Sequence, residues 1–111
     1  MQIARGTFTG HGSNFNGQFD AEGFQVIMAG RFSQSLLPFN VPKASITYRS
    51  LVDFSGTFTI GFSTPPSFVG KDTVDITFRR QGDIVLHLTG RLASPTDRRQ
   101  IVTGSAQWPQ H

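Results

Sequence analysis

Apolar and polar side chains alternate with a period of two across the middle of the chain. Even-numbered positions carry the apolar residues, namely Ile46, Tyr48, Val52, Phe54, Phe58, Ile60 and Phe62. Successive side chains of a β-strand point to opposite faces, so this pattern predicts strands with one buried and one solvated face. Eleven Phe and a single Glu strengthen the prediction, because aromatic residues suit a pleated surface and strong helix formers are scarce.

The same signals extend over the whole chain and predict an all-β fold. We expect about eight antiparallel strands, at residues 2–9, 14–20, 24–32, 44–54, 57–63, 72–80, 83–92 and 99–108. The 111 residues allow one domain, 1–111, and the mostly short connections favour local hairpins. A small up-and-down barrel is the favoured architecture because closure removes sheet edges, and a two-sheet β-sandwich is the alternative.

The positions of glycine and the parity of the apolar residues predict three hairpins. A two-residue loop at Glu22–Gly23 changes the parity, whereas three-residue loops at Phe54–Gly56 and Arg80–Gly82 preserve it. The loop at 54–56 would place Val52 opposite Phe58, and a single strand bent at this glycine is the alternative. The chain would then run as a series of neighbouring strands.

The loop at 80–82 predicts the register of its two strands. It places Phe78 opposite Ile84 on the apolar face and Asp75 opposite His87 on the other face. Opposite charges facing each other across a solvated face support this pairing.

The composition excludes several classes of protein. The chain has no Cys, which rules out disulfides, thiolate nucleophiles and cysteine-based metal centres. It lacks an apolar stretch of the roughly 18 residues that a membrane-spanning helix needs, and Met1–Arg5 does not begin a signal peptide, so we expect a cytoplasmic protein. The net charge is only +3, so the pI near 10.2 overstates the resemblance to a nucleic-acid-binding protein.

Two segments, residues 36–42 and 64–70, are apolar although they fall between predicted strands. Both contain proline in mid-segment, which lacks the N–H that a central strand needs. We therefore expect irregular connections that cover an open end of the barrel, meet a second subunit, or form the portal of a ligand site. The expected ligand-binding residues are Phe39 and Phe68 in these segments, and Tyr48 and Ser50 on the inward face of their strand.

Asp75 and His87 form the carboxylate and imidazole pair that the predicted register brings face to face. Such a pair can act as a general base, and Tyr48 would assist it in an isomerase or cyclase. An ordinary cross-strand pair on the solvated face is the favoured interpretation. The histidines at 11, 87 and 111 lack the spacing of metal ligands, so we expect neither a metal nor a cofactor.

Two arginine pairs, Arg79–Arg80 and Arg98–Arg99, predict an anion-binding patch if closure of the barrel brings them together. Asp83 and Asp97 stand close to these pairs and would neutralise part of their charge. Because nearly all Phe alternate inward, bases would lack aromatic rings on which to stack, and nucleic-acid binding is disfavoured.

Three functions from different classes fit these patterns. The favoured one is a non-enzymatic barrel that binds a small apolar or aromatic ligand in its interior or mouth. The second is an interaction protein with a filled barrel, in which segments 36–42 and 64–70 make homo-oligomer or partner contacts. The third is a barrel enzyme that uses the pair of Asp75 and His87.

Overall fold

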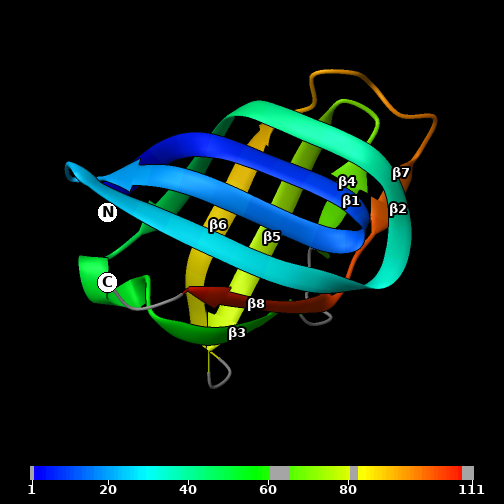
Figure 1. The fold of residues 1–111 in the computed structure, drawn as a ribbon. Coiled ribbons are helices and arrows are strands. Elements are labelled where there is room, and N and C mark those ends of the chain that lie inside the picture. The colour runs from blue at the N-terminus through cyan, green and yellow to red at the C-terminus, as the bar shows by residue number, and fades with distance from the viewer. Residues whose placement is uncertain (1, 61–65, 81–82, 109–111) are drawn as a thin grey trace.

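The computed structural model describes residues 2–60, 66–80 and 83–108, and nearly all of them are in strands (Figure 1). The strands are β1 (Gln2–Ala21), β2 (Phe24–Tyr48), β3 (Gly56–Ile60), β4 (Phe68–Gly70), β5 (Thr73–Arg80), β6 (Asp83–Arg91), β7 (Arg99–Ile101) and β8 (Gly104–Trp108). One turn of 3-10 helix, η1 (Leu51–Asp53), separates β2 from β3. The all-β prediction is confirmed.

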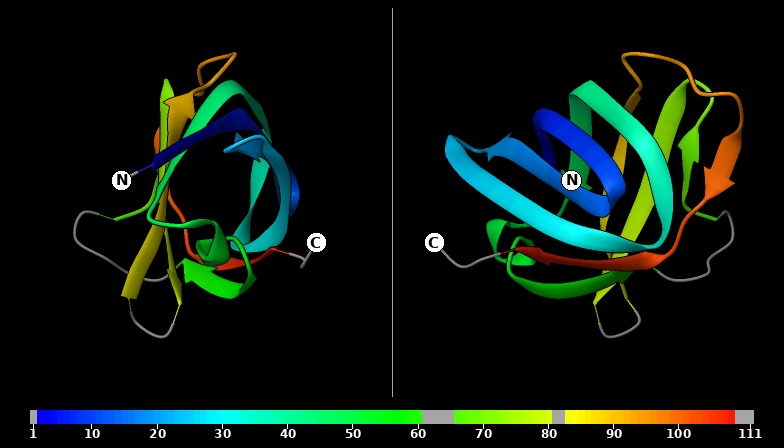
Figure 2. Two further views of the ribbon diagram at one scale, coloured as in Figure 1. Left: turned by 90° about the vertical axis from the view of Figure 1, so that its left-hand side faces the viewer. Right: turned by 45° about the vertical axis from the view of Figure 1, so that its right-hand side comes forward.

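Five of the described strands close into a barrel. β2 pairs with β6 through residues 43–47 and with β8 through residues 29–32, and the pairs β8–β3, β3–β5 and β5–β6 complete the ring. β1 pairs along β2, while β4 and β7 extend the sheet beyond β5. The ring is visible in the left view of Figure 2, so the predicted barrel forms and the alternative sandwich does not. The expected up-and-down order is wrong, because the strands follow one another around the ring as β2–β6–β5–β3–β8.

The hairpin between β1 and β2 turns at Glu22 and Gly23. Both residues have positive φ angles, 54° and 86°, as a type I′ turn requires. Ala21 faces Phe24 across the turn, and the two strands stay paired through seventeen residue pairs interrupted by register shifts. The predicted two-residue hairpin is confirmed.

The segment 36–42 is not the irregular connection that we expected, because β2 runs through it without a break. Pro38 lies where two residues of β2 oppose one residue of β1, and Pro42 lies at a second bulge of the same kind. A bulge leaves a residue out of the ladder, so a proline there costs no ladder hydrogen bond. Thr64 and Pro65 of the other segment lie outside the described residues, and its end forms β4.

The predicted hairpin at 54–56, with Val52 opposite Phe58, is wrong, and so is the alternative of one bent strand. The chain leaves the sheet after Tyr48, and β3 pairs with β8 and β5 instead. The cause is local: the Asp53 carboxylate accepts hydrogen bonds from the backbone N–H of Arg49 at 3.0 Å and of Ser50 at 3.3 Å. These bonds stabilise η1 in competition with a strand.

From Thr73 to Phe78, the register of β5 and β6 differs from the prediction by two residues. Phe78 faces Leu86 instead of Ile84, and a bulge follows this pair. A shift of two leaves a side chain on its predicted face, and the expected buried residues Val74, Ile76, Phe78, Leu86 and Leu88 are buried. The side chain of Ile84 lies outside what the structure describes. Asp75 faces Thr89, and its relation to His87 is therefore diagonal. Gln81 and Gly82 of the predicted loop lie outside the described residues.

Two clusters of aromatic rings fill much of the barrel. In the first, Phe8, Phe15, Phe32 and Phe39 contact one another with ring centroids 4.5 to 6.2 Å apart. The second runs from Phe19 through Trp108 and Phe54 to Tyr48, with centroids 4.7 to 6.2 Å apart. Tilted contacts of this kind add to the hydrophobic burial.

Candidate functional site

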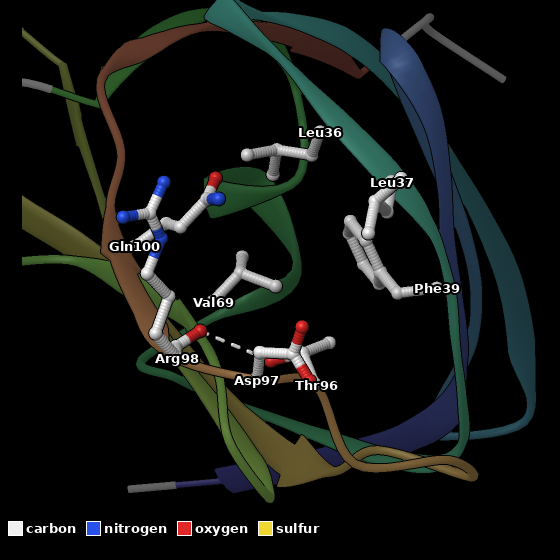
Figure 3. A pocket seen from close by; sticks show the side chains of 8 residues that line it. All are labelled: Leu36, Leu37, Phe39, Val69, Thr96, Asp97, Arg98 and Gln100. Carbon is white, nitrogen blue, oxygen red and sulfur yellow. Dashed lines mark hydrogen bonds between the residues drawn. The ribbon is translucent and has the colours of Figure 1, made fainter.

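A pocket of about 520 Å³ opens at the end of the barrel where β2 curves past β4 and β7. We call it the mouth pocket, and Figure 3 shows its lining side chains. They are Leu36, Leu37, Phe39, Val69, Thr96, Asp97, Arg98 and Gln100.

The apolar wall comes from the two segments that the sequence analysis singled out. Leu36, Leu37 and Phe39 belong to the first segment, and Val69 of β4 belongs to the second. The bulge at Pro38 changes the parity of β2, so Leu36 and Phe39 are both buried although they are three residues apart. Leu37 is 76% exposed, which leaves a large apolar side chain at the rim.

The polar wall is the connection from residue 93 to β7. Thr96 fixes this connection: its hydroxyl accepts a hydrogen bond from the backbone N–H of Lys71 at 2.8 Å and donates one to the carbonyl of Arg98 at 3.0 Å. Gly70 lets β4 approach closely, because a Cβ there would overlap the Arg98 carbonyl. Within the described residues, the Arg98 guanidinium has neither an ion-pair nor a hydrogen-bond partner, so the pocket has a free cation at its edge.

The four predicted ligand residues do not come together. Phe39 lines the mouth pocket, but Phe68 lies outside it, with the guanidinium carbon of Arg99 4.1 Å from its ring centroid. Tyr48 is buried at the opposite end of the barrel, and Ser50 is exposed beside η1. The expectation that Ser50 faces inward is therefore wrong, because β2 ends before it.

A second pocket, of about 370 Å³, lies at that opposite end. We call it the aromatic-end pocket; its lining is Phe24, Gln25, Val26, Leu51 and Phe54. Behind Phe54, the Tyr48 hydroxyl donates a hydrogen bond to the Glu22 carboxylate at 3.0 Å. Burial, together with this bond, raises the pKa of Tyr48 above its ordinary value.

The two arginine pairs lie at opposite ends of β5, so the predicted joint patch of Arg79, Arg80, Arg98 and Arg99 is wrong. Arg99 faces Gly70, which faces Thr73 at the start of β5, whereas Arg79 lies six residues further on, about 20 Å away along an extended strand. Arg80 donates to the carbonyl of Ser55 at 2.7 Å. Its guanidinium carbon also lies 5.3 Å from the centroid of the Phe58 ring, so Arg80 holds the connection into β3 in place.

Asp75 and His87 are in contact, with Asp75 Oδ1 and His87 Nε2 2.7 Å apart. The side chains are 36% and 43% exposed on the outer face of the barrel. Neither residue lines the mouth pocket or the aromatic-end pocket. Tyr48, which was expected to assist this pair in catalysis, is buried in the interior of the barrel. Within the described residues there is no group of three metal-ligating side chains.

Comparisons with models of known protein families, with curated proteins and with solved structures find no match to this chain. In the part of the chain that the structure describes, no helix is long and apolar enough to cross a membrane.

Sequence reasoning missed part of the mouth pocket. Arg98 was singled out for its charge, but Thr96 and Gln100 carried no signal, because nothing in the local sequence relates them to β2. Gln100 accepts a hydrogen bond from Gln34 at 3.4 Å, a contact between residues 66 positions apart. Such a contact follows from barrel closure and not from any local pattern.

Proposed function

We propose that this protein binds a small apolar or aromatic molecule in the mouth pocket, without catalysis. The observation that carries the proposal is the meeting of the two apolar segments, which are distant in sequence and line one cavity through Leu36, Leu37, Phe39 and Val69. A volume of about 520 Å³ falls in the range of small-molecule sites, which are mostly apolar with a few polar groups.

The filled interior supports a ligand at the mouth over one at the barrel centre. Phe39 belongs both to the pocket wall and to the inner aromatic cluster, where its ring lies 5.6 Å from Phe8 and 6.2 Å from Phe32. These rings form a packed floor below the pocket. A bound molecule would rest on this floor and stay near the surface.

Arg98, whose guanidinium has no partner among the described residues, extends the proposal to the ligand's polar group. Figure 3 shows Arg98 and Gln100 across the cavity from Leu37 and Phe39. Guanidinium groups pair readily with carboxylate or sulfonate oxygens. The preferred ligand is thus apolar over most of its surface and carries an acidic group at one end.

Binding of N-phenylnaphthylamine, a neutral aromatic probe whose fluorescence rises in apolar sites, tests the apolar wall. Leu37→Gln should weaken binding about fivefold, because about 1 kcal/mol of apolar contact is lost. Ile3→Gln is the matched control, since Ile3 is an exposed apolar residue outside the pocket. Equal affinity of the wild type and Leu37→Gln, or an equal loss in Ile3→Gln, would contradict the proposal.

The exposure of Leu37 also favours a second candidate, a homo-oligomer formed through the same rim. Native mass spectrometry separates the two. Added mass on each subunit that is lost on gentle activation supports ligand binding. An oligomer without added mass that becomes monomeric in Leu37→Gln supports the interaction function instead.

A further inference from the structure

A row of positive charge crosses the outer face of the barrel, away from the mouth pocket. Lys43 of β2 directly faces Arg91 of β6, and both side chains are exposed. Arg5 of β1 faces Ser45, two residues along β2 from Lys43. Each cation is exposed and stands next to a buried residue, namely Ala4, Ala44 or Leu92, so the three cations share the outer face.

The arrangement is electrostatically unfavourable as it stands. Like charges directly opposite each other destabilise a strand pair. Neither Arg5, Lys43 nor Arg91 forms an ion pair with any residue that the structure describes. Asp75, the carboxylate in the neighbouring row, is bound to His87. The three charges therefore have no ion-pair partner within 4.0 Å among the described residues.

A pocket of about 490 Å³ lies beside this row. Its lining is Arg5, Gly6, Thr7, Pro42, Lys43, Ala44 and Ser45. It forms at the bulge where Pro42 and Lys43 of β2 oppose the single residue Thr7 of β1. The bulge bends the strand and separates the side chains on either side. Two cations and two hydroxyls thus line one concave surface.

The geometry points to a binding site for a tetrahedral oxyanion, the phosphate group of a small ligand, between Arg5 and Lys43 with Arg91 at its edge. Ammonium, guanidinium and hydroxyl groups all donate hydrogen bonds, and phosphate oxygens accept several at once. The anion would also remove the repulsion between Lys43 and Arg91. This site shares no lining residue with the mouth pocket, so each can be tested without the other.

Titration with inorganic phosphate at constant ionic strength, followed by amide NMR shifts, tests the site. We expect saturable shifts at residues 5–7 and 42–45, and about fivefold weaker binding in Lys43→Gln. Lys71→Gln is the matched control, because Lys71 is the other lysine of the chain and does not line the pocket. Shifts that do not saturate, or an equal loss of phosphate affinity in both variants, would show diffuse electrostatic attraction without a defined site and would overturn the proposal.

Stability provides a second readout that does not depend on NMR. Without phosphate, Lys43→Gln should be at least as stable as the wild type, because a like-charge pair is removed. Phosphate should raise the Tm of the wild type more than that of Lys43→Gln, since a ligand stabilises the state that binds it. Equal shifts in both proteins would contradict the site.

Further titrations identify the source of the phosphate group. Tighter binding of ribose phosphate than of inorganic phosphate supports a phosphate monoester, and the reverse order supports the free anion. A short single-stranded thymidine oligonucleotide serves as the polyanion. Binding of this oligonucleotide without binding of either small phosphate would overturn the proposal, because it would show an extended polyanion surface.

Discussion

The two ends of the barrel both present apolar hollows, yet they differ in the charged group at the rim. At the aromatic end, Phe54 packs against Tyr48 and Trp108, and the Tyr48 hydroxyl is bonded to Glu22. Leu37 at the mouth and Phe24 at the aromatic end are both largely exposed, but at the mouth the Arg98 guanidinium has no partner among the described residues. Figure 1 shows η1 and the pocket-lining part of β2 on opposite sides of the molecule.

This difference indicates separate roles for the two hollows. Rings that contact one another and a paired buried hydroxyl contribute to stability without any ligand. The Arg98 guanidinium, which has no partner among the described residues, contributes little to the stability of the folded state and would gain a partner from a bound anion. Apolar lining does not separate the ends, and Trp108 Nε1 at the aromatic end is itself buried without a hydrogen-bond partner among the described residues. The ends are separated by the Arg98 guanidinium at the mouth.

The largest expected contrast is in stability. Phe54→Ala should lower the free energy of unfolding by about 3–5 kcal/mol, because it opens a cavity between Tyr48 and Trp108. Leu37→Ala should change it by less than about 0.5 kcal/mol, because the side chain is exposed. Urea denaturation followed by circular dichroism measures both. A loss below about 1 kcal/mol for Phe54→Ala would remove the structural role of the aromatic end.

A smaller effect should appear in the titration of Tyr48, the single tyrosine of the chain. Burial, followed by the hydrogen bond to Glu22, raises its pKa in the folded state, so ultraviolet absorbance should titrate above about pH 10 in buffer and near pH 10 in denaturant. The unfolded chain then loses the phenolic proton first. The associated stability is complete below about pH 10 and is lost as pH rises through the folded pKa.

Tyr48→Phe provides the control for that titration. It removes the titrating group, so its stability should fall less steeply above about pH 10 than that of the wild type. It should also cost about 1 kcal/mol near neutrality, because the hydrogen bond to Glu22 is lost. Identical alkaline slopes in the two proteins would show that Tyr48 is solvated at this end.

The sequence predicts which face of a strand is buried better than it predicts which residues pair across neighbouring strands. Period-two alternation correctly indicated the buried residues Val74, Ile76, Phe78, Leu86 and Leu88. Alternation does not determine the register, because a shift of two residues keeps each side chain on the same face. Phe78 therefore faces Leu86 and not Ile84. The hairpin at 54–56 failed for another reason. The Asp53 carboxylate accepts hydrogen bonds that stabilise η1, and the alternation of apolar residues gives no information about these bonds.

For the candidate site, too, the sequence indicated which segments are apolar but not which segments lie together. The apolar content of segments 36–42 and 64–70 indicated a covered end or portal, and residues of both segments line the mouth pocket. Their meeting depends on β2 curving around the barrel, which no local pattern encodes. Prolines suggested irregular loops, whereas bulges keep Pro38 and Pro42 within a continuous strand.

The smallest expected effect separates the two ends by charge. Arg98→Gln should weaken binding of anilinonaphthalene sulfonate by about threefold, because an exposed guanidinium loses its ion pair with the sulfonate. Binding of neutral N-phenylnaphthylamine should stay unchanged, since the apolar wall is intact. Arg49→Gln is the matched control, because Arg49 is exposed next to η1 at the aromatic end. If Arg98→Gln weakens the binding of both probes equally, the arginine supports the shape of the pocket. If it weakens the binding of neither, the acidic group of the ligand does not contact Arg98, and the mouth pocket selects ligands by apolar shape alone.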